Sequence, residues 1–125
     1  MNPYLEEVID LHVSIEALFA RGEGRIESMV ARFHPAFSMV TPTGLQVDLQ
    51  AVEQLFTQRS GTQPGLTIEL TDLVILAQGP DGAMVCYRET HRLPAQAAKT
   101  RISTALFSFQ EGRVLWRHLH ETWAA

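Results

Sequence analysis

Apolar residues recur every three or four positions at the start of the chain and every second position later on. The early pattern predicts an amphipathic helix, which begins after Asn2 with Pro3 at its first position and ends at the glycine-containing segment 21–24. Its apolar stripe, which includes one histidine, consists of Leu5, Val8, Ile9, His12, Ile15, Leu18 and Phe19.

Two more helices and a hairpin are predicted in the first half of the chain. The spacing of apolar residues predicts a helix over 25–33, which ends at His34-Pro35 because the residue before a proline avoids the α conformation. Alternation then predicts strands at 37–41 and 45–47 with a turn between them. Asp48 is a suitable cap for a third helix over 49–59.

The second half of the chain has the pattern of long strands. They cover residues 66–78, 83–93, 100–110 and 113–123, and short turns between them favour antiparallel neighbours. At about 3.3 Å per residue such strands would run roughly 35 Å, so the sheet must bend and gain a concave side. The sequence therefore predicts one α+β domain over 1–125: a cone-shaped, mixed but mostly antiparallel sheet of about six strands, packed against three helices from the N-terminal half.

Composition narrows the class of protein without naming a ligand. The 125 residues are 46% hydrophobic and 19% charged, as in globular proteins, and the net charge of -4 does not favour nucleic-acid binding. No segment is long and apolar enough for a membrane span, and the first residues do not resemble a signal peptide, so we expect a cytoplasmic protein. Cys86 is the one cysteine and is interpreted as a small hydrophobe.

Two segments carry a resemblance to a known family. The order of elements, the stretch FHPAFSMVTPTG at 33–44 and the stretch WRHLHETW at 116–123 together resemble the nuclear transport factor 2-like superfamily, in particular its SnoaL-like and kinase-association-domain branches. The resemblance implies a cystatin-like roll, a cone-shaped pocket closed by the N-terminal helices, and a homodimer. Members of that superfamily include isomerases, dehydratases, hydrolases and non-catalytic association domains, so the resemblance does not imply one reaction.

Alternation along the last three strands separates an inner from an outer face. The odd-numbered positions hold more of the large apolar residues, so we expect them to face the helices, unless a β-bulge reverses the order locally. The polar and aromatic side chains expected on this inner face are Tyr87, Glu89, His91, Arg101, Ser103, Arg117, Glu121 and Trp123.

The inner face offers candidates for acid and base chemistry. Two partly buried carboxylates, Glu89 and Glu121, are candidate general bases, with His91, His12 or Tyr87 as proton donor and no cofactor required. The expected ligand-binding residues are His12, Arg101, Ser103 and Trp123. The alternative is structural: the glutamates pair with arginines at 101 and 117, and the histidines are hydrogen-bonded wall residues.

The outer face suggests a contact with a second copy. Trp116, His118 and His120 are expected there, where a large aromatic side chain is typical of an interface, so they are predicted to form the homodimer contact. The His-x-His pair lacks a third ligand, and no metal site is predicted.

Two functions remain open at this level. The first is a protein that binds a small, mostly apolar molecule with a polar end, with or without an isomerase, dehydratase or hydrolase activity. The second is a non-catalytic association module whose pocket is vestigial. Unpaired carboxylates in the pocket would favour the first function, and closed arginine–glutamate pairs would favour the second.

Overall fold

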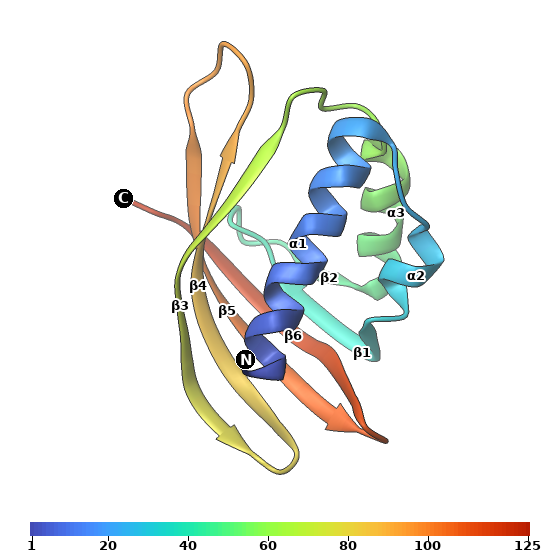
Figure 1. Ribbon diagram of the computed structural model, residues 1–125, viewed down its shortest axis with the longest axis vertical. Helices are drawn as coiled ribbons and strands as arrows, with labels where there is room; N and C mark the ends of the chain where they lie inside the picture. The colour runs from blue at the N-terminus through green and yellow to red at the C-terminus, as the bar shows by residue number, and fades with distance from the viewer.

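The computed structural model describes residues 1–125 as three helices laid against one curved sheet of six strands (Figure 1). The sheet order is β2-β1-β6-β5-β4-β3, with β1 and β6 parallel and all other neighbours antiparallel. The predicted α+β class and the mixed, mostly antiparallel sheet are thereby confirmed. The elements are α1 (Pro3–Arg21), α2 (Ile26–Val30), β1 (Phe33–Val40), β2 (Gln46–Asp48), α3 (Leu49–Arg59), β3 (Thr67–Gly79), β4 (Gly82–Arg92), β5 (Lys99–Gln110) and β6 (Arg113–Trp123).

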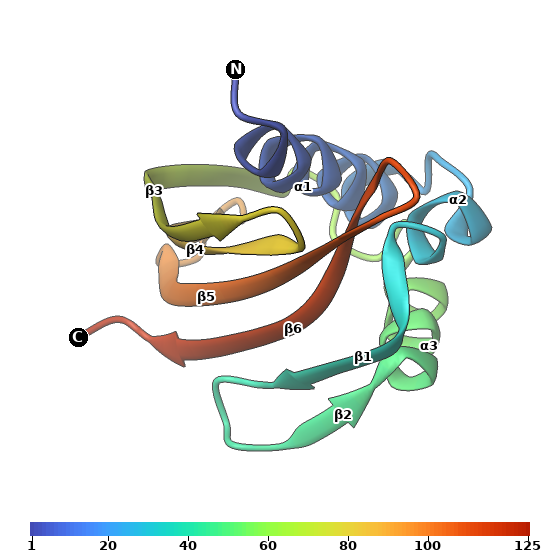
Figure 2. The same cartoon turned by 90° about the horizontal axis from the view of Figure 1, so that it is seen from below.

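Helix α1 begins and ends where the sequence pattern predicts. The side chain of Asn2 accepts hydrogen bonds from the backbone N–H groups of Tyr4 at 2.8 Å and Leu5 at 3.3 Å. Gly22 ends the helix with φ of 66°, in the left-handed region that glycine adopts without strain. Helix α1 lies over β3 and its neighbours while α3 lies beside β1, so the helices cover the concave side of the sheet (Figure 2). None of the helices is both long and apolar enough to cross a membrane.

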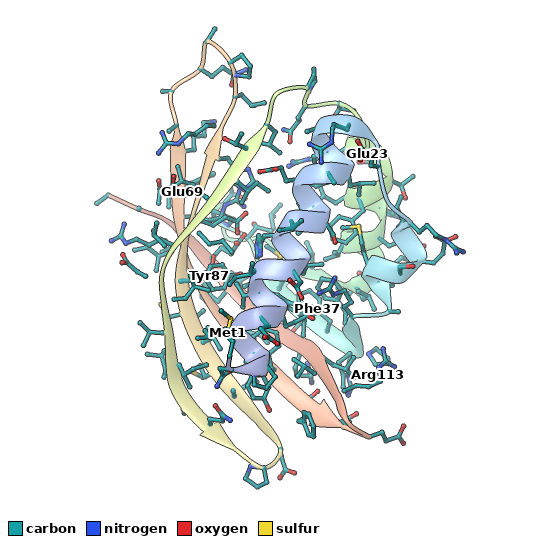
Figure 3. All side chains as sticks on the ribbon, viewed as in Figure 1. Met1, Glu23, Phe37, Glu69, Tyr87 and Arg113 are labelled. Atoms are coloured by element: carbon teal, nitrogen blue, oxygen red, sulfur yellow. The ribbon has the colours of Figure 1, made fainter.

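The core fills the layer between the helices and the sheet, and it is rich in aromatic side chains. The ring of Trp116 lies 4.5 Å from that of Phe107 and 6.0 Å from that of Phe33, measured between centroids, and Phe33 contacts Phe37 in an edge-to-face pair at 4.8 Å. Tyr87 and Phe37 both lie in this layer (Figure 3). Packed aromatic rings therefore form much of the interior between the helices and the sheet.

The second helix is shorter than predicted, and the first strand is longer. Helix α2 ends at Val30, and β1 already begins at Phe33, which is buried and registered against Trp116 of β6. Pro35 lies within the strand because β1 pairs regularly with its neighbours only from Ser38 onward. The apolar position at 33 thus belongs to the sheet and not to the helix stripe.

A β-bulge in β6 reverses the predicted faces of its residues from Val114 to Arg117. Leu106 of β5 is registered with His118, but the next residue, Phe107, is registered with Trp116, so Arg117 has no partner on β5. The prediction that Trp116 lies on the outer face is wrong: its side chain is only 1% exposed and belongs to the core. The prediction that Arg117 faces the helices is also wrong, since Arg117 donates to the backbone oxygen of Ala36 at 2.7 Å in an exposed contact.

Candidate functional site

The structure brings most of the predicted inner-face residues together on three neighbouring strands. Across β4 and β5, Tyr87 is registered with Ser103 and Glu89 with Arg101, and across β5 and β6, Ser103 is registered with Glu121. Since side chains alternate along a strand, these registers place all five on the concave face of the sheet.

Glu89 is held by two histidines. One of its carboxylate oxygens lies 2.9 Å from Nε2 of His12 on α1, and the other makes a short hydrogen bond with Nε2 of His91. The side chains of His12 and Glu89 are each only 6% exposed. The other ring nitrogen of His12, Nδ1, lies 2.7 Å from the backbone oxygen of Val8, and a carbonyl oxygen can only accept, so Nδ1 carries a hydrogen. The pKa of Glu89 is held well below its usual value, so Glu89 is a carboxylate and can only accept; Nε2 of His12 therefore donates as well, and His12 is an imidazolium.

The electrostatics agree with this ion pair. Burial raises the pKa of Glu89, but the His12 charge, the hydrogen bonds from both histidines and the Arg101 charge outweigh burial and hold that pKa well below its usual value. Burial lowers the pKa of His12, and the charge and hydrogen bond of Glu89 more than compensate, so the pKa is raised. Both shifts therefore favour the charged form of the pair.

Glu121 has a different environment. It accepts one hydrogen bond from Nη1 of Arg101 at 3.1 Å and another from Oγ of Ser103 at 3.0 Å. Burial raises the pKa of Glu121; the charge of Arg101 lowers it and the charge of Glu89 raises it again, and the net shift is upward. The two glutamates thus have pKa values shifted in opposite directions, which is the arrangement that separates a proton-exchanging carboxyl from a permanently charged one.

Arg101 has hydrogen-bond donors without acceptors. Its Nη2 lies 3.5 Å from Nε2 of His91, but that nitrogen already donates to Glu89 and has no lone pair to offer. The Nε atom of Arg101 is buried and has no hydrogen-bond partner. The guanidinium also lies 5.3 Å from the ring centroid of Trp123, which is 46% exposed.

These contacts bear on the structural alternative raised by the sequence. Glu121 does form an ion pair with Arg101, whereas Arg117 lies elsewhere, and Glu89 pairs with histidines instead of an arginine. Glu121 is therefore paired with Arg101 and also has a raised pKa, so neither the functional nor the structural alternative describes the site completely.

A cavity of about 100 Å³ lies beside these residues. Its charged end is formed by His12, Glu89, His91, Arg101 and Glu121. Its remaining walls are largely apolar and come from α1, α3, β1 and β6: Leu11, Ile15, Phe19, Phe33, Phe37, Met39, Val52, Leu55, Phe56, Arg59, Trp116 and Leu119. The volume is small beside the roughly 300–1,000 Å³ of sites for drug-sized ligands, so a ligand that fits without rearrangement is small.

Tyr87 lies behind the cavity and does not line it. Its side chain is fully buried, its ring centroid lies 5.5 Å from that of His12, and its hydroxyl has no hydrogen-bond partner. Burial, together with the charges of Glu89 and Glu121, raises the pKa of Tyr87 well above its usual value. Tyr87 is therefore a neutral phenol next to the site.

The remaining predicted residues lie outside this cluster. His118 lies on the outer face, where its Nδ1 is 2.7 Å from Oγ of Ser38, and His120 is exposed two residues further on. Trp123 contacts Arg101 but does not line the cavity. No group of three or more His, Cys, Asp or Glu side chains has the spacing of a metal site.

Sequence reasoning missed the wall supplied by β1 and α3. Phe37 and Met39 line the cavity because β1 pairs in parallel with β6, a long-range pairing that the local pattern does not predict. It also missed Glu7, whose carboxylate accepts from Trp116 Nε1 at 2.9 Å and from Arg32 at 2.8 Å and 2.9 Å. Glu7 fixes the indole ring that lines the cavity, and a glutamate in the first turns of a helix gives no signal for such a role.

Comparison with solved structures identifies the family. An NTF2-like protein of unknown function from Pseudomonas aeruginosa, PA1314, is 40% identical to this chain; the match covers 98% of both chains with a TM-score of 0.91. The chain belongs to the NTF2-like family. This membership confirms the resemblance seen in the sequence.

More distant structures share the NTF2-like fold. The CaMKII hub homology domain from Chlamydomonas reinhardtii is 17% identical, covers 98% of this chain and 96% of its own, and has a TM-score of 0.79. The association domain of CaMKII from C. elegans is 12% identical, with 95% of each chain covered and a TM-score of 0.74. At these identities the likeness concerns the fold alone. No protein-family model and no curated protein matches the sequence.

Proposed function

We propose that this NTF2-like protein binds a small, mostly apolar molecule in the cavity between α1, α3 and the sheet, and that Glu121 exchanges a proton with it. The observation that carries the proposal is a buried carboxyl of raised pKa, Glu121, at the charged end of an otherwise apolar cavity. Such a combination is typical of sites that use general acid–base chemistry.

The two glutamates have separate roles in this proposal. Glu89 stays ionised and keeps His12 in place, because the charge of His12 and the hydrogen bonds from both histidines stabilise its carboxylate form. Glu121 takes up and releases the proton, and a carboxyl whose pKa lies nearer neutrality does this more readily. The reaction class that fits is a proton transfer within an isomerisation, dehydration or hydrolysis that requires no cofactor.

A cavity-filling variant tests ligand binding. Leu119→Trp places a large ring into the cavity wall, and Leu45→Trp places the same ring in the turn before β2, where Leu45 is 63% exposed. Fragments of small apolar compounds should shift the amide resonances of cavity residues in the wild type and in the Leu45 variant, and not in the Leu119 variant. Equal binding to both variants would contradict the proposal.

A second function, assembly with another copy of this chain, is favoured by the outer face of the sheet. Val74, Met84 and Leu106 are exposed there at 49%, 38% and 40%, although sheet faces are usually covered or polar. His118 opposes Leu106 on the same face. In this proposal the homodimer contact is centred on Leu106, with His118 and His120 at its side and without Trp116.

Sedimentation at micromolar concentration tests the homodimer. The wild type should sediment as a dimer, and Leu106→Glu should sediment as a monomer because a charge in an apolar interface is costly. The exposed Glu69→Lys variant is the control for a change of surface charge. A wild-type monomer, or an unchanged mass in the Leu106 variant, would remove this candidate.

A further inference from the structure

The hydrogen bonds at the charged end of the cavity show which kind of polar group is missing there. Each oxygen of Glu89 accepts from a histidine, and the oxygens of Glu121 accept from Arg101 and Ser103. Each carboxylate oxygen at this end therefore already accepts a hydrogen bond from a protein donor. On Arg101, by contrast, only Nη1 has an accepting partner, while Nε is buried without one and the nitrogen nearest Nη2 is itself a donor.

Unused donors in a buried position are costly unless something accepts from them. The side chain of Arg101 is only 19% exposed, so bulk water satisfies little of its donor capacity. A planar guanidinium with two free N–H directions matches the two oxygens of a carboxylate better than a hydroxyl or an amine. An ammonium group would add donors where donors are already in excess.

The charges that line the cavity also favour a ligand with an anionic group. Apart from His91, the charged side chains of the lining are three positive groups, His12, Arg59 and Arg101, and two negative groups, Glu89 and Glu121. The cavity thus carries a formal charge of about +1, although the whole chain carries -4. A local excess of positive charge in an acidic protein favours an anion at this place.

We infer that the polar end of the ligand is a carboxylate bound by the free N–H groups of Arg101, with its short apolar chain lying against the rings and aliphatic side chains of the cavity. This inference rests on the proposed function and specifies its ligand class. The cavity of about 100 Å³ limits the ligand to a short monocarboxylate. Arg59, on the last turn of α3, adds a second positive charge to the same lining.

Three probes with one chain length test the inference: pentanoate, pentanamide and pentylamine, titrated into the full chain and followed by amide and indole resonances. Pentanoate should bind with a dissociation constant about tenfold lower than that of pentanamide, equivalent to about 1.4 kcal/mol. Pentylamine should bind most weakly. Equal or tighter binding of the amide or the amine would overturn the inference.

A matched pair of variants tests whether the guanidinium of Arg101 is the group that binds the carboxylate. Arg101→Lys keeps the charge and loses the planar fork, and we expect it to weaken pentanoate binding about tenfold. Arg88→Lys makes the same change on the exposed outer side of β4 and should leave the dissociation constant within about twofold. Undiminished pentanoate binding in the Arg101 variant would also overturn the inference.

The outcomes separate the two proposals. If pentanamide or pentylamine shifts the cavity resonances and pentanoate does not, the carboxylate inference fails while ligand binding in the cavity stands. If none of the three probes shifts those resonances, both fail. The comparison of probes uses the wild type alone, so it remains decisive even if Arg101→Lys does not fold.

Discussion

Replacing Glu89 by glutamine should destabilise the protein by an amount that depends on pH. At pH 8 the amide group of the introduced glutamine can donate to Nε2 of a neutral His12 while its oxygen accepts from His91, so all three groups keep a partner. The charge-assisted bonds are lost and neutral ones replace them, which costs about 1–2 kcal/mol. Near pH 8 the loss of stability caused by the substitution is therefore moderate.

At lower pH the same variant is destabilised further, by a cost that the wild type does not have. Below pH 6.5, the reference pKa of histidine, the unfolded chain protonates His12, but in the folded variant the counter-ion is gone. Holding the buried ring neutral at pH 5 costs about 1.36 kcal/mol for each of 1.5 pH units, or roughly 2 kcal/mol more than at pH 8. The total loss at pH 5 is then about 3–4 kcal/mol, within the range for a broken buried pair.

Thermal melts at the two pH values measure this difference. For a chain of this size about 1 kcal/mol corresponds to roughly 4 °C in Tm, so we expect a decrease of about 4–8 °C at pH 8 and about 12–16 °C at pH 5. Glu69→Gln, on β3 and exposed, is the matched control and should change Tm by less than about 2 °C at either pH. An equal loss at both pH values would refute the ion pair between His12 and Glu89.

Three further measurements follow from the structure. Carboxyl carbon NMR titration should place the pKa of Glu121 above 4.5 and that of Glu89 below it, since their causes act in opposite directions, and the reverse order would disprove the assignment of the proton-exchanging group. Glu7→Gln, which weakens the hydrogen bonds to Trp116 and Arg32, should cost about 1–3 kcal/mol in urea unfolding and shift the fluorescence of the indole to longer wavelength; an unchanged spectrum would contradict its anchoring role. Gly82→Ala should lower Tm strongly because its Cβ would lie 2.0 Å from the backbone oxygen of Phe107, whereas Gly79→Ala, with no atom within 4 Å, should not; equal effects would show that this close approach is unimportant.

The pattern of the sequence predicts the elements well because each depends on local signals. The cap at Asn2, the apolar stripe of α1 and the alternation along β4 and β5 are properties of neighbouring residues, and the structure agrees with them. The faces of the last strand depend on one extra residue, Arg117, which the pattern does not distinguish from a regular strand position. That residue moves Trp116 from the predicted surface into the core.

The sequence predicts which residues belong to the candidate site better than it predicts the contacts between them. Alternation alone groups Glu89, Arg101 and Glu121 on one face, as the structure has them. It cannot tell that Glu89 pairs with His12, which lies 77 positions away on a helix whose angle to the sheet is set by packing. The protonation of the site depends on that contact, so the chemical roles of the two glutamates emerge only in three dimensions.

The parallel pairing of β1 with β6 has a consequence for the order of folding. Ser38 and His118, hydrogen-bonded across this pair, are 80 positions apart, so closing it carries a larger entropic cost than forming any of the hairpins between β3 and β6. The antiparallel strands should therefore assemble first, and the wall with Phe37 and Met39 should join them late. A molecule bound in the cavity touches this late-forming wall, so it should retard unfolding while leaving the rate of folding nearly unchanged.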